Sequence, residues 1–168
     1  MDSATLKAAQ APLKQKYRDD PGAAVVTLRA SGALGDGVTC SVETGQALVR
    51  AGLHPATGGM AVTVCSGDML LQALVACAGV TLGAVATSLG FAIRDAKLTA
   101  EGDLDFRGTL GVSKEAPVGF TAIRLSVAID SDLDDGQVAT LIKLTERYCV
   151  VLQTLKNPAV LSVESRRM

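Results

Sequence analysis

The chain contains few aromatic side chains: of its 168 residues none is tryptophan, two are tyrosine and three are phenylalanine. Proteins that hold single-stranded nucleic acids stack the bases on aromatic rings, so this scarcity argues against such a platform. The 16 basic and 17 acidic residues nearly cancel and leave a formal charge of −1. A surface without excess positive charge does not attract nucleic acid or an anionic membrane. We therefore expect no nucleic-acid partner.

Histidine and closely spaced cysteines are also scarce. The chain has one histidine, His54, and no CxxC pair among its four cysteines, Cys40, Cys65, Cys77 and Cys149. Structural zinc sites combine such pairs with histidines at short spacing, so we expect no metal site. A Ser-His-Asp triad would require His54, and no GxSxG elbow is present. His54 precedes a proline and is predicted to lie in a surface turn, while Cys40 and Cys65 are predicted to be structural.

Charge is absent from one long stretch, Met69–Ile93, which lies between Asp68 and Arg94. Its apolar residues recur at helical spacing most of the way round, which predicts a long helix. About 20 apolar residues can span a bilayer, and no Lys/Arg cluster flanks this stretch. Several residues also dilute its apolar character: Gln72, Thr81, Thr87, Ser88 and three glycines. We therefore expect a central helix surrounded by a sheet, and no membrane span.

The N-terminal residues are polar and mixed in charge. They lack the basic start and apolar core of a signal peptide, which predicts a cytoplasmic location. Thiols there stay reduced unless they take part in redox chemistry. Residues 1–22 are predicted to form a helical extension in which Pro12 interrupts or starts a helix. Residues 23–168 are predicted to form a single domain, since a chain of this length can bury one core.

Short β-like segments precede the long helix. The residue pattern predicts strands at Ala23–Ala30, Val38–Thr44, Gln46–Arg50 and Met60–Val64. The glycine-rich residues 31–37, SGALGDG, are predicted to connect the first two of these strands. Ser66 or Asp68 is predicted to cap the long helix, because both side chains can accept a hydrogen bond from a free amide.

Two strands follow the long helix. Arg94–Gly108 is polar and alternating, which is typical of a half-exposed strand. Val118–Asp130 is the clearest strand in the chain, and the residues GTLGVSKEAPVG between the two are predicted to form a long hairpin loop. One face of this clearest strand is apolar and comprises Ile123, Leu125, Val127 and Ile129.

A second helix is predicted over Asp134–Lys156, where Asn157 and Pro158 end it. Its apolar stripe comprises Val138, Leu141, Ile142, Thr145, Cys149, Leu152 and Leu155. A short strand at Ala159–Glu164 is predicted to follow. The order of sheet, apolar helix, sheet, amphipathic helix and strand is that of an α+β fold.

Cys77 and Cys149 differ from the other two cysteines because each lies on the apolar face of a predicted helix. A buried free cysteine often serves only as a small hydrophobic residue. Two cysteines on helices that pack together can also form a disulfide, provided that their Cα atoms approach to about 4.4–6.8 Å. The residue pattern leaves both interpretations open.

A thiol attacks as its thiolate, and an apolar environment raises the pKa of the thiol. Cys77 lies more than two turns beyond the helix start at Asp68, too far for the helix dipole to help much. Its neighbours at helical spacing carry no charge. A reactive Cys77 therefore requires a cation from elsewhere in the fold, and Arg29 and Arg50, on or near the strands before the helix, are the candidates.

Two segments resemble the OsmC/Ohr family of thiol-dependent peroxidases, SGDMLLQALVACAGVTLGAVATSLGF at 66–91 and LTERYCVVLQTLKNP at 144–158. Members of that family carry a cysteine on a long central helix, in a pattern such as P-x-E-L-L-x-A-A-L-A-x-C, and a second cysteine on a later helix. Cys77 and Cys149, which are 72 positions apart, match these two cysteines. The residues GDLDFRG also fit the family's strand after the central helix.

The resemblance implies an intertwined homodimer in which an antiparallel sheet wraps a long central helix and the sites lie at the subunit interface. Cys77 would be the peroxidatic thiolate, which attacks a hydroperoxide, becomes a sulfenic acid and releases an alcohol or water. Cys149 would resolve that sulfenic acid as an intramolecular disulfide, which a dithiol reductant then reduces. The family uses no metal and no organic cofactor, so the resemblance implies none here.

The chain departs from the organic-hydroperoxide members at two positions. Those members have a Gly-Gly-Arg turn near the first hairpin, where this chain has Leu34 within SGALGDG. They also have a glutamate where this chain has Gly67, although Asp68, one position later, matches the acid of some less-characterised members. The departures leave a second interpretation open: a dimeric small-ligand-binding or thiol redox-sensing protein of the same fold, without peroxide turnover.

Overall fold

The computed structural model of the chain describes residues 2–5, 8, 10–11, 15, 19, 31–34, 39–43, 48–57, 63–111 and 113–167. Within the predicted N-terminal extension, residues 3–5, 8, 10–11, 15 and 19 are helical. The predicted strand at Ala23–Ala30 and the candidate residue Arg29 lie outside the described residues. The division into an extension and a single domain stays a prediction.

A four-stranded sheet comes first in the chain. Its strands lie in the spatial order β1 (Ser31–Leu34), β2 (Thr39–Glu43), β3 (Leu48–Gly52) and β4 (Val64–Cys65). The first two pairings are antiparallel and the third is parallel. β2 and β3 confirm the strands predicted at Val38–Thr44 and Gln46–Arg50. The prediction that all of SGALGDG is a connection is wrong at its start, because its first four residues form β1; a hairpin connection needs only a few residues.

The long uncharged stretch forms α2 (Ser66–Leu89), a helix of 24 residues, as predicted. Its N-cap residue is Cys65, and no side chain makes a capping hydrogen bond there. The prediction that Ser66 or Asp68 caps the helix is therefore wrong; the chain enters α2 directly from β4, so both residues already lie within its first turn. Gly90 ends α2 with a φ of 73°, a left-handed conformation that glycine adopts without strain.

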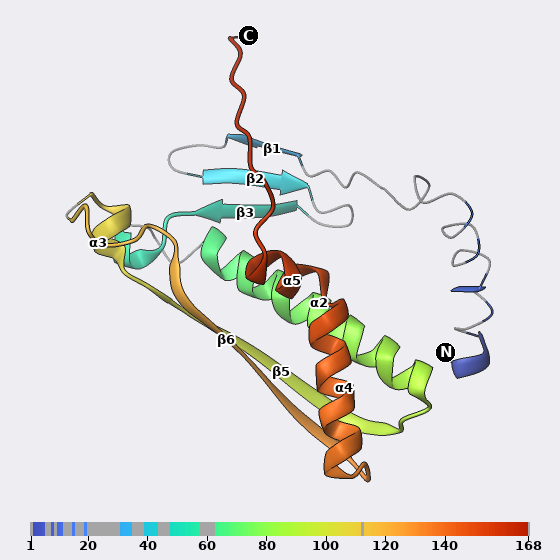
Figure 1. Cartoon of the computed structure of the whole chain (residues 1–168). Coiled ribbons are helices and arrows are strands. Elements are labelled where there is room, and N and C mark those ends of the chain that lie inside the picture. The colour runs from blue at the N-terminus through green and yellow to red at the C-terminus, as the bar shows by residue number, and fades with distance from the viewer. Residues whose placement is uncertain are drawn as a thin grey trace.

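A two-stranded antiparallel ribbon follows, made of β5 (Ile93–Leu104) and β6 (Phe120–Ser131) (Figure 1). As predicted, β6 alternates half-buried residues, Ile123 to Ile129, with exposed ones. On the exposed face Arg94 pairs with Asp130 across the strands at 2.6 Å. Because side chains alternate between the two faces, this pattern fixes which face of the ribbon covers α2.

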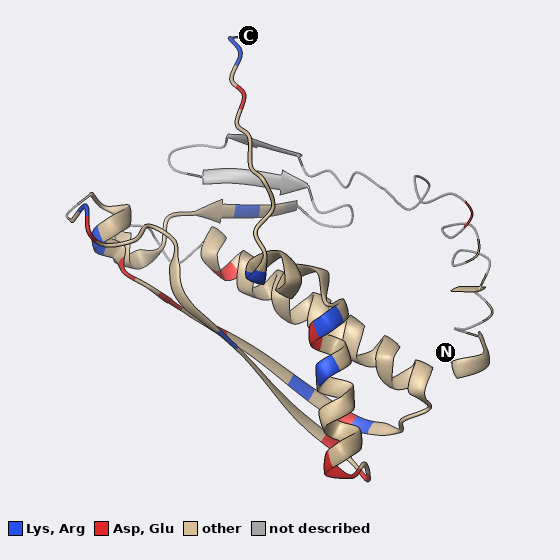
Figure 2. Cartoon of the chain, in the orientation of Figure 1, with Lys and Arg blue, Asp and Glu red and all other residues tan. Residues whose placement is uncertain are grey.

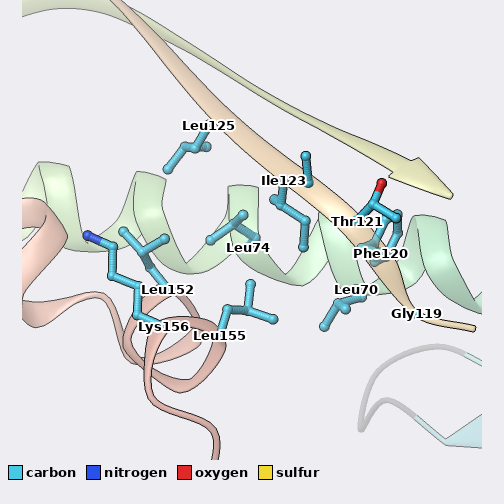
Figure 3. A pocket seen from close by; sticks show the side chains of 11 residues that line it. Leu70, Leu74, Gly119, Phe120, Thr121, Ile123, Leu125, Leu152, Leu155 and Lys156 are labelled. Carbon is cyan, nitrogen blue, oxygen red and sulfur yellow. The ribbon is translucent and has the colours of Figure 1, made fainter. Parts of the chain in front are cut away.

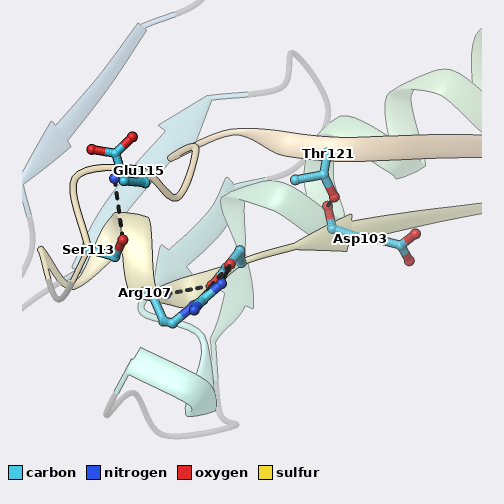
Figure 4. Close-up of polar contacts among 6 residues, drawn as sticks. Asp103, Arg107, Ser113, Glu115 and Thr121 are labelled. Carbon is cyan, nitrogen blue, oxygen red and sulfur yellow. Dashed lines mark hydrogen bonds and ion pairs between the residues drawn. The ribbon is translucent and has the colours of Figure 1, made fainter.

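The connection between β5 and β6 contains the short helix α3 (Phe106–Thr109). The Asp105 carboxylate accepts a hydrogen bond from the Arg107 N–H at 3.0 Å and pairs with the Arg107 guanidinium at 2.6 Å (Figure 4). At the start of β6 the Thr121 hydroxyl donates to the Asp103 carbonyl at 3.0 Å. These bonds stabilise the end of the ribbon that carries α3.

The second amphipathic segment forms two helices. α4 (Asp135–Tyr148), which begins with a capping box, and α5 (Val150–Lys156) meet at Cys149. The backbone of Cys149 is extended, with a φ of −71° and a ψ of 106°. The prediction of one continuous helix over Asp134–Lys156 is therefore wrong at this residue, although the apolar stripe continues across the break and Cys149 remains fully buried.

The predicted final strand at Ala159–Glu164 is not formed within the described chain. Val160, Leu161 and Val163 are almost completely exposed, at 87–101%. In Figure 1 this tail leaves α5, passes across the four-stranded sheet in the view and ends beyond it. The residue pattern indicated an extended backbone, but a strand also requires a partner edge, which the pattern does not reveal.

α2 lies at the centre of the fold, between the β5–β6 ribbon and the helices α4 and α5 (Figure 1). Its buried residues recur every four positions and form a single stripe of Leu74, Ala78, Leu82 and Ala86. Beyond its first turn α2 carries no charged residue (Figure 2). This arrangement confirms the predicted α+β layout with a central apolar helix.

Among the described residues, α2 is the one helix long and apolar enough to cross a membrane by length and composition alone. Its buried stripe packs against the ribbon and against two helices of the same chain. A core helix satisfies the same length and composition test, and the packing accounts for the apolar character of this one stripe of α2.

Candidate functional site

Cys77 and Cys149 meet in the core, between α2 and the break that separates α4 from α5. Cys149 has no exposed surface and packs with Leu74 and Ala78, while the half-buried Cys77 lies against this cluster. The two thiols are hydrogen-bond partners and both are free. The prediction that the two helices pack together is confirmed.

The environment lowers the pKa of the Cys77 thiol below its ordinary value. Burial by itself acts in the opposite direction and raises this pKa. The backbone N–H groups of Val151 and Val150 and the thiol of Cys149 outweigh that effect, because each donates to the sulfur and favours its anionic form. Thr81 adds less, because its hydroxyl already donates to the Cys77 carbonyl at 2.7 Å. The net result is a thiol that ionises more readily than its apolar surroundings suggest.

The amide donors exist because of the break between α4 and α5. In a continuous helix the Val150 and Val151 N–H groups would bond to carbonyls four residues earlier. The extended backbone at Cys149 starts a new helix instead, and the first N–H groups of a helix have no partner within it. These two amides are the ones that act on the Cys77 sulfur.

Cys149 behaves in the opposite way. Burial raises the pKa of its thiol, and the neighbouring Cys77 raises it further, because two adjacent thiolates repel each other. The Leu152 and Val151 amides oppose this rise without reversing it. The pair therefore divides into a thiol with a lowered pKa, Cys77, and a neighbour with a raised pKa, Cys149.

Of the three predicted supporting residues, Arg29 lies outside the described residues, and neither Arg50 nor Asp68 acts on this pair. Arg50 is exposed on β3, and among the described residues no Lys or Arg side chain contributes to the shift of the Cys77 pKa. Asp68 is exposed and lies nine positions before Cys77. Nine residues correspond to about 13.5 Å along the axis and about half a turn around it. Asp68 therefore points away from Cys77.

The sequence reasoning looked for a cation and missed the backbone amides as donors. Backbone amides occur at every residue except proline, so the residue types in a sequence do not show where an amide points. One signal was present: Val150 and Val151 are β-branched, and with Tyr148 and Cys149 they form four consecutive weak helix formers in the middle of the predicted helix. Such a run is a position where a helix can break.

An apolar groove of about 530 Å³ lies beside the cysteine pair, between α2, β6 and α5. Figure 3 shows Leu74, Ile123, Leu152 and Leu155 pointing into it. Lys156 is the one charged side chain that lines it. A second hollow of about 210 Å³ shares Lys156 and Leu152 with the groove and is lined by Cys149. An apolar molecule that extended from the groove into this hollow would therefore reach Cys149.

His54 lies away from this site. Its ring stacks on Phe106 with centroids 4.9 Å apart, and its Nδ1 accepts a hydrogen bond from the Ala56 N–H at 3.0 Å. Cys65 lines the same hollow as His54, near the start of α2. Within the described residues no group of three or more His, Cys, Asp or Glu side chains is arranged to hold a metal ion.

The lowered pKa of Cys77 predicts a distinct pH dependence of its alkylation. Because only the thiolate reacts, the midpoint of its rate against pH should lie below that of the same thiol in the denatured chain. The midpoint of Cys149 should lie higher, because its pKa is raised. Iodoacetamide labelling at a series of pH values, quantified for each cysteine by mass spectrometry, measures both. Denatured protein serves as the control, and equal midpoints for Cys77 in the folded and denatured chain would contradict the prediction.

The family model described as "OsmC-like protein" matches residues 59–164, more than half of the chain, and this range includes both cysteines of the pair. No curated protein matches the sequence.

Solved structures with a similar fold include an OsmC-like protein from Mycoplasma pneumoniae, with a TM-score of 0.67 and 16% identity over 79% of this chain and 89% of that one. An organic hydroperoxide resistance protein OsmC from Legionella pneumophila aligns with a TM-score of 0.62 and 16% identity, covering 79% and 91% of the two chains. An organic hydroperoxide resistance protein from Elizabethkingia anophelis gives 0.63 and 15%, covering 80% and 91%. At these identities the likeness establishes the fold alone.

Proposed function

The chain belongs to the OsmC-like protein family, and on this premise we propose that it is a thiol-dependent peroxidase that reduces organic or inorganic hydroperoxides. One observation carries the proposal: two free cysteines meet in the core, and the pKa of one is lowered while that of the other is raised. A nucleophile and a protonated partner are what a two-cysteine peroxidase requires. The names of two structural relatives, which describe hydroperoxide resistance, agree with this chemistry.

In the first step of the proposed reaction, the Cys77 thiolate attacks one oxygen of the hydroperoxide. An S–O bond forms and the O–O bond breaks, so Cys77 becomes a sulfenic acid and the alkoxide leaves with a proton as an alcohol, or as water from hydrogen peroxide. The amides of Val150 and Val151 favour the thiolate before the attack. Apolar substituents of the substrate would lie in the groove beside Leu74 and Leu152.

In the second step the Cys149 sulfur attacks the Cys77 sulfenic acid. A disulfide forms, and the hydroxyl of the sulfenic acid leaves as water with the proton of the Cys149 thiol. A dithiol reductant then restores both thiols and becomes a disulfide itself. Because Cys149 already packs against Cys77, little movement of α5 is needed for this step. A cytoplasmic location would keep the pair reduced between turnovers.

We also propose a homodimer. In the single chain only four of the 24 residues of α2 are buried, although the helix is apolar, and Val80 is 75% exposed. The tail residues Val160 and Val163 are also exposed. Apolar surface of this kind is stabilised when a partner covers it, and a second copy would cover it in the intertwined arrangement of the family.

A second candidate function is favoured by the groove of about 530 Å³. Its size lies within the range of small-molecule sites, and its lining is apolar apart from Thr121 and Lys156. A dimeric ligand-binding or redox-sensing protein would use this groove and leave Cys77 and Cys149 as packing residues or as a slow sensor.

Disulfide mapping distinguishes the two functions. One equivalent of cumene hydroperoxide or hydrogen peroxide is added to the reduced protein, free thiols are blocked, and the chain is digested for mass spectrometry. A peroxidase is expected to form the Cys77–Cys149 linkage rapidly, because the thiolate and its partner are already adjacent. Denatured protein treated in the same way is the control. A folded chain in which Cys77 stays unoxidised would refute the peroxidase proposal and favour the binding protein.

A further inference from the structure

Gln153, on α5, reaches back across the helix break to α4. Its side-chain Nε2 donates to the Glu146 carbonyl oxygen at 2.7 Å. In a continuous helix this carbonyl would accept from the Val150 N–H, four residues later. Between these two described residues no such bond forms. Gln153 therefore supplies the hydrogen bond that the break removes from Glu146, and this bond stabilises the broken arrangement.

Two neighbouring side chains hold this arrangement in place. Asn157 Nδ2 donates to Gln153 Oε1 at 3.3 Å, so the amide nitrogen of Gln153 is directed toward α4. Lys156 Nζ pairs with the Glu146 carboxylate at 3.0 Å. The ion pair is half exposed and screened by solvent, so it adds little. The bond from Gln153 is the contact that replaces a backbone bond of the helix.

We propose that Gln153 is a positioning residue, whose bond to the Glu146 carbonyl holds α5 in the orientation that directs the Val150 and Val151 amides at Cys77. If this bond is lost, the Glu146 carbonyl accepts a hydrogen bond from the Val150 N–H instead, as in a continuous helix. This exchange extends α4 through Cys149. The amide would then leave the sulfur of Cys77. Gln153 acts through the helix and has no contact with the thiol in the described structure.

The proposal rests on the proposed function in one respect, since a peroxidase would use the thiol of Cys77. The orientation of the Val150 and Val151 amides can be tested without peroxide. Gln153→Met keeps the length of the side chain and its freedom from charge, and removes the donor. The readout is the rate of iodoacetamide alkylation against pH, resolved for each cysteine by mass spectrometry. Cys65, at the start of α2 and remote from the break, is the internal reference. Lys143→Met, at an exposed position of α4, is the matched control.

Gln153→Met is expected to raise the alkylation midpoint of Cys77 by about one pH unit, which slows its reaction at pH 7 by about tenfold. The profile of Cys65 should not change, and Lys143→Met should match the parent. Asn157→Ala, which leaves the donor in place but removes its orienting partner, should shift Cys77 in the same direction by less. This second variant carries the test if Gln153→Met does not fold.

The positioning role is overturned if the alkylation profile of Cys77 is unchanged in the variants that fold. It is also overturned if the alkylation of Cys77 and of Cys65 slows equally, because this result indicates a general loosening of the structure. Peroxide consumption, measured on the same samples, separates the two proposals. A shifted Cys77 in a protein whose parent consumes no peroxide supports the role of Gln153 and refutes the peroxidase. If the parent consumes peroxide and the alkylation midpoint of Cys77 is unchanged in Gln153→Met, the peroxidase is supported and the role of Gln153 is refuted.

Discussion

A Cys77→Ser variant is expected to reduce hydroperoxides at least about a thousandfold more slowly than the parent, because the reaction loses its nucleophile. A serine hydroxyl is hardly ionised near neutral pH, and its oxygen does not form the sulfenic acid that the second step requires. The hydrogen bonds from Val150 and Val151 cannot compensate, since they favour an anion that serine does not form there. Consumption of cumene hydroperoxide with excess dithiothreitol measures the effect.

Cys65→Ser is the matched control for this experiment, because Cys65 is also a free, half-buried cysteine associated with α2 but lies twelve positions from Cys77. It should retain the activity of the parent. A Cys77→Ser protein that consumes cumene hydroperoxide and hydrogen peroxide as fast as the parent would show that the chemistry, if any, lies elsewhere. Circular dichroism and thermal unfolding of both variants establish that the fold is retained.

A Cys149→Ser variant should consume one equivalent of peroxide per chain and then stop. The first step needs only the Cys77 thiolate, and the serine hydroxyl still offers a hydrogen-bond donor in the place of the Cys149 thiol. The second step has no sulfur to form the disulfide, so Cys77 remains as the sulfenic acid and proceeds to the sulfinic acid with more peroxide. Trapping with a sulfenic-acid reagent, followed by mass spectrometry, measures the arrested species.

Sustained turnover by Cys149→Ser with a dithiol would argue against the resolving role, because the reductant would then attack the sulfenic acid directly. A variant that does not consume even the first equivalent would point instead to a need for the Cys149 thiol in the first step. In that case its hydrogen bond to Cys77, rather than its later attack, would be its main contribution.

The burial pattern of β6 and the length of α2 agree with the sequence predictions, because both depend on periodicity. A strand that alternates apolar and polar residues has one face to bury, and a helix with apolar residues at every fourth position has one stripe to bury. The final segment Ala159–Glu164 shows the limit of this reasoning. Its pattern predicts an extended backbone, but a strand also needs a partner, and within the described chain this segment pairs with no strand.

The break at Cys149 shows the same limit within a helix. Val150, Val151 and their neighbours are weak helix formers, yet the apolar stripe from Val138 to Leu155 continues through them. Periodicity therefore predicts a continuous helix. The carboxamide of Gln153 replaces the hydrogen bond that the break removes from Glu146, and this compensation depends on the direction of a side chain in space.

The sequence by itself determined the order of elements, the central apolar helix and the two cysteines that match the family pattern, because residue type and spacing specify these features. Only the tertiary structure showed which groups lower the pKa of the Cys77 thiol. Within the described residues these include backbone amides at a helix break, and no Lys or Arg side chain contributes. Every residue except proline carries such an amide, so the direction of the chain, and not its composition, determines where the amide acts.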